Sequence, residues 1–237
     1  MEIIRLDSYK TLSQEAASLI LKEIKRKNNA VICAATGNSP DGTYAILKQF
    51  FDEQPGLFSN LRIIKLDEWG GVPMGDPGTC ENYLQNHLIR PLQIAGDRYL
   101  SFNSNPEDAV QECHRIQQEL KKTGVIDICI LGLGMNGHLA LNEPGETLEA
   151  DVHVAKLSGS SLTHSMISEM KIKPSYGLTL GMADILQSKF ILLIISGIKK
   201  KKITADLLNR KISTTLPASF LWLHSNVVCL IDKEAYL

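Results

Sequence analysis

Aromatic residues are scarce in this sequence, and long apolar runs are absent from it. Phe, Trp and Tyr together make up 6% of the 237 residues. The longest apolar run, FILLII at 190–195, is far shorter than the roughly 20 residues that a membrane-spanning helix needs. We therefore expect no membrane partner.

An excess of charge of either sign is also lacking. The chain has 25 Lys and Arg against 26 Asp and Glu, for a formal net charge of −1. Without a basic field, nucleic acid is not an expected partner. Any anionic ligand must therefore be bound by a few local groups.

Paired cysteines are missing as well. The five cysteines, at 33, 80, 113, 129 and 229, form no C-x-x-C pair, and three of them lie inside apolar runs as buried free thiols do. The opening residues, MEIIRLDSYK, lack the cationic and apolar segments of a secretory signal. We therefore expect a cytoplasmic protein with reduced thiols. No His/Cys cluster has metal-ligand spacing and no nucleophile elbow occurs, so neither a metal nor serine chemistry is expected.

Short apolar runs and amphipathic segments alternate along the chain. The runs at 30–35, 61–66, 126–132, 190–196 and 226–231 lack polar alternation, which is typical of strands buried on both faces of a parallel sheet. Helical patterns lie between them: one starts at a capping box of Thr11 and Gln14, and another is opened by Asn105-Pro106 and ended by Gly124.

No repeat, low-complexity tract or flexible linker interrupts this pattern. It predicts one α/β domain over residues 1–237, with a doubly wound, mainly parallel, Rossmann-like sheet and helices on both faces. Ligands of such sheets bind beyond the carboxyl ends of the strands. Four unusual segments follow predicted strands.

The first is AATGNSPDGTY at 34–44, in which Thr36, Gly37, Asn38 and Ser39 form a small polar turn before a helix. Backbone N–H groups at such a turn bind phosphate. The Gly-Lys-Ser/Thr ending of a nucleotide-binding P-loop is absent, which favours a phosphosugar over ATP. An ordinary strand-to-helix turn explains the segment equally well.

The second is KLDEWGGVP at 65–73, where Asp67 and Glu68 close an apolar strand. Partial burial raises a carboxyl pKa toward neutrality, so such an acid can take and return a proton. A helix cap or a surface acid is the alternative interpretation.

The third is ILGLGMNGHLALNEPGE at 130–146, whose glycines at 132, 134 and 137 match G-x-G-x-x-G. A dinucleotide site needs a helix directly after them, but Pro144-Gly145 follows too soon. The glycines instead predict a tight loop that aims His138, a general base at neutral pH, with Glu143 to orient it.

The fourth is ISGIKKKKI at 195–203, a strand end followed by four lysines. The run is typical of a solvated helix face. A lysine at the end of a strand is, however, also placed to bind a phosphate. Together, the four strand ends predict one shared rim at the carboxyl edge of the sheet. The residues of this rim predict acid–base chemistry on a phosphorylated small molecule, without a cofactor.

These motifs also carry a family resemblance. LDEW, GLGMNGHLALNEPGE, LTLG, SGIKK and PASFLWLH resemble the aminosugar-phosphate deaminase/isomerase family in order and spacing, over essentially the whole chain. Within it, KLDEW, PGTCE, LTLGMADIL and PASFLWLHSN look most like the galactosamine-6-phosphate branch, because glucosamine-6-phosphate enzymes usually have Asp-Glu-Tyr and lack the late Pro-Ala-Ser-Phe-Leu-Trp run.

The resemblance implies conversion of a hexosamine 6-phosphate to a ketohexose 6-phosphate and ammonia. His138 would take the anomeric hydroxyl proton and open the ring, supported by Glu143. Asp67 would shuttle the proton from C2 to C1 through an enolamine that loses ammonia. The loop 36–39 and Lys200 would hold the phosphate, with Glu68 and His164 as further substrate contacts.

The sequence departs from the family at three places. Asn136 stands where many members have an aspartate, so it would orient groups without accepting a proton, and Glu143 would carry more of the electrostatic load. The segment 158–167 lacks the arginine that helps to bind phosphate in the glucosamine-type enzymes, and His164 would partly substitute for it. The basic residues of an allosteric site are not evident around His153 and Ala155, so we expect hyperbolic kinetics without activation by N-acetylglucosamine 6-phosphate.

Three alternatives remain open beside the galactosamine-6-phosphate enzyme. The glucosamine-6-phosphate deaminases act on the C4 epimer, and the sequence does not identify the residue that reads C4. A 6-phosphogluconolactonase shares the Gly-x-Gly-x-x-Gly-His loop but continues it differently. A non-catalytic sugar-phosphate sensor would have lost Asp67 or His138, and both are present. A homo-oligomer is also left open.

Overall fold

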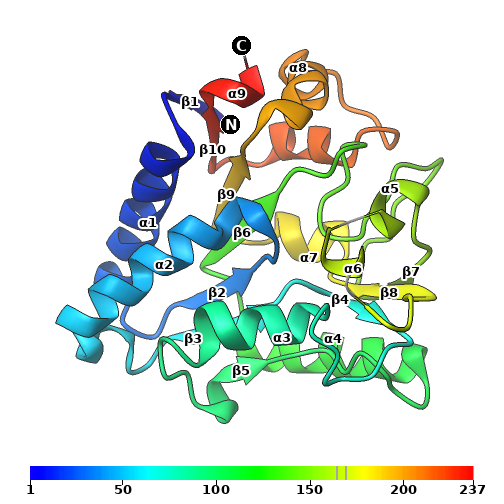
Figure 1. Ribbon diagram of the computed structural model, residues 1–237, viewed down its shortest axis with the longest axis horizontal. Coiled ribbons are helices and arrows are strands. Elements are labelled where there is room, and N and C mark those ends of the chain that lie inside the picture. Colours follow the sequence, from blue (N-terminus) through cyan, green and yellow to red (C-terminus); the bar gives the residue numbers. More distant parts are fainter. Residues whose placement is uncertain (164, 169, 237) are drawn as a thin grey trace.

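Seven parallel strands form the centre of the molecule (Figure 1). The computed structural model describes residues 1–163, 165–168 and 170–236. The strands are β1 (Glu2–Leu6), β2 (Val31–Ala34), β3 (Arg62–Lys65), β5 (Tyr99–Leu100), β6 (Ile128–Gly132), β9 (Phe190–Ile195) and β10 (Val227–Asp232). They pair in the order β1-β10-β9-β6-β2-β3-β5, and every pair is parallel.

Helices cover both faces of this sheet because successive strand residues point to opposite sides. Ile32 belongs to an apolar cluster with α1 (Tyr9–Arg26), α2 (Asn38–Glu53) and the end of α3 (Cys80–Leu84). Its neighbour Cys33 belongs to the cluster on the other face, with α4 (Ala109–Thr123), α7 (Met182–Leu186), α8 (Lys201–Leu208) and α9 (Lys233–Tyr236). The predicted doubly wound parallel α/β fold is confirmed.

A second, smaller sheet lies beside the first and was not predicted from the sequence. Its antiparallel strands are β4 (Asp67–Gly70), β8 (Tyr176–Thr179) and β7 (His153–Ala155), in the order β4-β8-β7. Only Leu66 separates β3 from β4, so Asp67 stands where the chain passes from one sheet to the other. The short helices α5 (Gly159–Leu162) and α6 (Ser165–Ser168) follow β7.

Two predicted helix starts are wrong. Helix α1 begins at Tyr9, three residues before the expected stripe, because Ser8 is the N-cap and forms the capping box with Thr11. Helix α4 begins at Ala109, because the carboxylate of Asp108, rather than Asn105-Pro106, accepts the first N–H groups. Its end at Gly124 is as predicted.

All five cysteines are free and buried. Cys33 in β2 and Cys129 in β6 face each other in the parallel register, and Cys229 lies in β10. Cys113 and Cys80 lie in α4 and α3. Within residues 1–163, 165–168 and 170–236, no helix has the length and apolar content needed to cross a membrane.

Candidate active site

The strand order reverses between β2 and β6. From β2 the chain continues to β3 and β5 on one side, and from β6 it continues to β9 and β10 on the other. Such a reversal opens a crevice at the carboxyl ends of the two strands. The loops after β2 and β6 meet there, because a Cβ built on Gly132 would lie 3.8 Å from Ser39 Oγ.

The loop after β2 runs directly into the amino end of α2. Gly37 is the N-cap residue and has a φ of 93°, a conformation that side chains disfavour, and α2 begins at Asn38. Thr36 and Ser39 are half-buried and Asn38 is exposed. The free N–H groups and positive dipole end of this 16-residue helix suit an anion.

The loop after β6 is as tight as the sequence predicted. Gly137 has a φ of 87°, and its N–H donates to the Gly134 carbonyl oxygen at 3.0 Å. Any side chain at Gly134 would collide with the ring of His138, because an added Cβ would lie 2.4 Å from it. The glycines therefore serve to place the imidazole, and the helix that a dinucleotide site needs does not follow.

The carboxylate of Glu143 lies beside the His138 ring. Its Oε2 is 3.4 Å from His138 Nδ1 and accepts a hydrogen bond from Asn136 Nδ2 at 2.8 Å. Its Oε1 accepts from the hydroxyls of Ser158, at 3.0 Å, and Ser161. Burial alone would raise the pKa of Glu143, but His138 and these donors lower it to about 2. Glu143 is thus a permanent anion beside the imidazole.

His138 Nδ1 is buried and lies outside hydrogen-bond geometry with Glu143, so the 3.4 Å approach is an electrostatic contact. The backbone N–H of His138 donates to Asn136 Oδ1 at 3.3 Å. Asn136 therefore holds both partners of the pair, one with each end of its amide. Ser158 and Ser161, which support Glu143 from the segment after β7, were not found from the sequence.

Asp67 begins β4, and its side chain is half-buried. Burial, together with the negative charge of Glu68, raises its pKa to about 7, although Lys65 and the Cys80 thiol oppose the rise. The Cys80 sulfur lies 3.9 Å from Asp67 Oδ1 and accepts a hydrogen bond from Thr36 Oγ1 at 3.4 Å. Cys80 therefore links Asp67 to the loop after β2, a link that the sequence did not reveal.

The predicted substrate contact at Glu68 does not fit the structure. Its side chain is fully buried, and Oε2 accepts from Lys65 Nζ at 2.7 Å. The backbone N–H groups of Trp69, Cys80 and Glu81 also donate to its two oxygens. With both oxygens engaged inside the protein, Glu68 anchors α3 to β4 and shapes the charge around Asp67.

Lys200 reaches the same rim from the end of β9. It closes a 3₁₀ turn after Gly197, and its Nζ donates to the carbonyl oxygen of Leu133 in the loop after β6. Burial lowers its pKa to about 8, so it is still mostly a cation at neutral pH. The structure thus brings together the loop 36–39, Asp67, the His138–Glu143 pair and Lys200. His164 lies outside the described residues.

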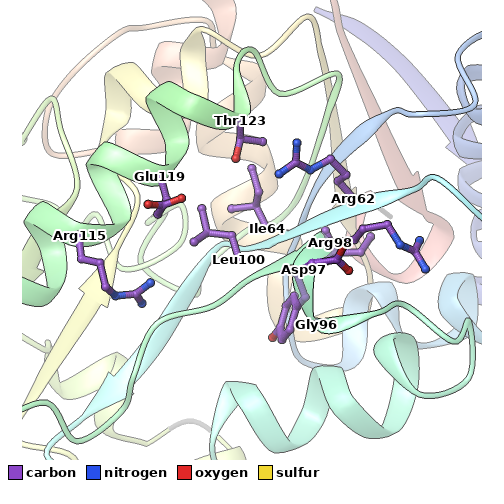
Figure 2. A pocket seen from close by; sticks show the side chains of 11 residues that line it. Arg62, Ile64, Gly96, Asp97, Arg98, Leu100, Arg115, Glu119 and Thr123 are labelled. Carbon is purple, nitrogen blue, oxygen red and sulfur yellow. The ribbon is translucent and has the colours of Figure 1, made fainter.

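A separate pocket of about 250 Å³ lies between the β3–β5 edge of the sheet and α4 (Figure 2). It is lined by Arg62, at the amino end of β3, and by Arg98, whose guanidinium donates to the carbonyl oxygens of Phe58 and Leu61. None of the predicted site residues lines it.

The described residues contain no group of three or more His, Cys, Asp and Glu placed for a metal ion. Metal-free and cofactor-free chemistry stays a prediction.

A doubly wound sheet with an anion-binding helix end, a carboxyl group of raised pKa and a His–Glu pair at its switch point is the architecture of an enzyme acting on a small anionic metabolite. Residues 7–229 match the family described as glucosamine-6-phosphate isomerases/6-phosphogluconolactonase, and the chain belongs to this family. The resemblance indicated by the motifs is confirmed.

Two curated proteins named as deaminases are similar to almost the whole chain. The chain is 42% identical over 228 residues to the Escherichia coli K12 protein named "Putative deaminase AgaI", covering 96% of this chain and 90% of that one. It is 36% identical over 237 residues to glucosamine-6-phosphate deaminase 1 of Bacillus subtilis strain 168, covering 99% and 98%.

Solved structures agree on the fold. That of a monomeric glucosamine-6-phosphate deaminase superposes with a TM-score of 0.94 at 36% identity, covering 99% of this chain and 98% of the other. The 6-phosphogluconolactonase of Trypanosoma brucei superposes with a TM-score of 0.78 at 23% identity, covering 99% and 97%. At that identity the likeness extends to the fold alone.

Proposed function

We propose that this protein converts galactosamine 6-phosphate and water to tagatose 6-phosphate and ammonia, as a deaminating aldose–ketose isomerase that uses no metal or cofactor. The observation that carries the proposal is Asp67: a half-buried carboxyl group with a pKa of about 7, linked through Cys80 to the anion-binding loop. Residues 1–237 act as a single domain in this proposal, in the cytoplasm.

Ring opening is assigned to His138. Its Nδ1 is buried next to Glu143, which leaves Nε2 to take the proton of the anomeric hydroxyl. The imidazolium that forms is then stabilised by the Glu143 carboxylate at 3.4 Å. Because Asn136 is an amide, Glu143 supplies the negative charge of this pair, and Asn136 holds it in place.

Proton transfer between C2 and C1 is assigned to Asp67. A base must be ionised to remove the C2 proton and must hold that proton until C1 accepts it. A pKa of about 7 makes both states accessible near neutral pH. The transfer passes through an enolamine and leaves an imine at C2, which adds water and releases ammonia to give the ketone.

The substrate phosphate is assigned to the loop after β2 and to Lys200. The N–H groups at the amino end of α2 supply directed donors, and the Lys200 ammonium supplies charge. The galacto epimer is favoured by the sequence motifs KLDEW, PGTCE, LTLGMADIL and PASFLWLHSN.

Ammonia release from galactosamine 6-phosphate and from glucosamine 6-phosphate, measured in parallel on purified protein, tests the proposal. We expect faster turnover of the galacto epimer and its loss in Asp67→Asn. The matched control is Asp97→Asn, an exposed acid that lines the separate pocket, and it should keep full activity. Faster turnover of the gluco epimer would replace the substrate but keep the mechanism. If neither epimer releases ammonia and the protein hydrolyses 6-phosphogluconolactone, both the proposed substrate and the proposed mechanism are wrong.

A further inference from the structure

Two tyrosine hydroxyls hold the carbonyl side of the loop after β2. Tyr83 Oη, in α3, donates to the carbonyl oxygen of Gly37 at 2.9 Å. Tyr9 Oη, in α1, donates to the carbonyl oxygen of Asn38 at 2.7 Å. Helix α2 lies between α1 and α3, so the loop is held from two sides (Figure 1).

The Tyr9 hydroxyl bridges two backbone groups of the first turn of α2. In a regular α-helix the N–H of Gly42 donates to the carbonyl oxygen of Asn38. The Gly42 N–H also donates to Tyr9 Oη at 2.8 Å, and Tyr9 Oη in turn donates to the same Asn38 carbonyl oxygen. Gly42 makes room for this arrangement, because an added Cβ would lie 3.1 Å from the Tyr9 ring and 2.5 Å from Ser13 Oγ.

The Tyr83 hydroxyl is fixed by its own surroundings. Its ring stacks on His87 with a centroid separation of 4.3 Å, and His87 Nδ1 lies 2.7 Å from Asp41 Oδ1. Burial and the Asp41 carboxylate raise the pKa of Tyr83 well above its ordinary value, so the phenol stays protonated and remains a donor. The shorter of its two contacts is the one to the Gly37 carbonyl oxygen.

Because of the geometry of the peptide bond, these two contacts also determine the direction of two backbone N–H groups. In a planar trans peptide the C=O and the following N–H point in opposite directions. Fixing the Gly37 carbonyl therefore fixes the N–H of Asn38, and fixing the Asn38 carbonyl fixes the N–H of Ser39. These two N–H groups belong to the loop assigned to the substrate phosphate.

We propose that Tyr9 and Tyr83 are positioning residues for the phosphate group of the substrate: each phenol holds one carbonyl away from the crevice and directs the next backbone N–H into it. This inference rests on the proposed function for the identity of the anion. Neither phenol touches the reacting carbons, so both affect binding and leave the chemical step unchanged.

The test compares Tyr9→Phe and Tyr83→Phe with wild type and with Tyr236→Phe. The first two keep the ring and remove one donor, and the third removes a hydroxyl from α9, which contributes no predicted site residue. We expect KM for the hexosamine phosphate, and the dissociation constant of inorganic phosphate measured by calorimetry, to rise about three- to tenfold in each loop variant. The kcat should stay within about twofold, and Tyr236→Phe should match wild type.

The calorimetric measurement separates failure of the inference from failure of the proposed function. If wild type releases no ammonia but binds phosphate, and the two variants bind it more weakly, the inference stands and the proposed reaction is wrong. Wild-type affinity for phosphate in both variants, or no phosphate binding by wild type, would overturn the inference. So would a fall in kcat with unchanged KM, because that pattern places the phenols in the chemical step.

Discussion

Replacing Asp67 by Asn should make the protein more stable at pH 8 while removing its activity. The pKa of Asp67 rises from its ordinary value of 3.8 to about 7 in the folded chain. The folded state therefore holds a proton that the unfolded state has released, and stability falls as pH rises between those two values. Asparagine has no such ionisation, so the variant escapes the loss.

The size of the effect follows from the pKa difference. A rise of about three pH units, at about 1.4 kcal/mol per unit, sets an upper bound of about 4 kcal/mol. Asp67 is half-buried, and solvent screening reduces the bound, so we expect about 2–4 kcal/mol. The gain is complete above about pH 7 and absent below about pH 4.

Urea unfolding of wild type and Asp67→Asn at pH 4, 6 and 8 measures this gain. Only a small part of the charge effect is present at pH 4, so the difference there contains mainly the other effects of the amide, and subtracting it leaves most of the charge effect. Asp97→Asn supplies the baseline for an exposed Asp→Asn exchange. A variant whose advantage over wild type is the same at all three pH values would show that burial of the Asp67 charge is not costly, and would refute the reasoning.

Three further predictions concern the remaining site. Glu143 has a pKa lowered to about 2, so its charge stabilises the fold above about pH 4.5 and that stabilisation is lost as pH falls toward 2. Glu143→Gln should lower the free energy of unfolding by up to about 3 kcal/mol at pH 7 and by about half of that or less at pH 3, and an equal loss at both would contradict this. Lys200 loses its proton near pH 8, so KM for the hexosamine phosphate should rise between pH 7 and 9 in wild type, whereas Lys200→Met should show a KM about tenfold higher at pH 7 and no such rise. Rate against substrate concentration should be hyperbolic and unchanged by N-acetylglucosamine 6-phosphate, and a sigmoidal curve sharpened by that compound would contradict the prediction.

The parallel sheet could be predicted because its strands are buried on both faces and therefore appear as continuous apolar runs. FILLII and VVCLI are examples, and both are strands close to the expected bounds. The small sheet could not be predicted in the same way. Its strands DEWG, YGLT and HVA are three or four residues long and mix polar, glycine and aromatic residues without a period of two.

The position of the rim could also be predicted, because residues that follow parallel strands collect at one edge of the sheet. The contacts that support the rim could not. Tyr9, Cys80 and Ser161 reach it from segments distant in sequence, and no local pattern marks them. Glu68 is the opposite case, because the sequence placed it at the rim and the structure does not. It is adjacent to Asp67 in the sequence, but its side chain points into the protein, since neighbouring strand residues face opposite sides.

All five thiols are buried, so we expect the native protein to react slowly with reagents that modify accessible cysteines. This slow reaction can be used to follow local opening of the fold. A thiolate must form and meet the reagent before it reacts, so labelling requires each site to open. Cys80 belongs to the small cluster beside the rim, whereas Cys33, Cys129 and Cys229 lie in the central strands. Mass spectrometry shows the order in which the individual cysteines are labelled. That order is the order in which their surroundings open, and no probe has to be added to the chain.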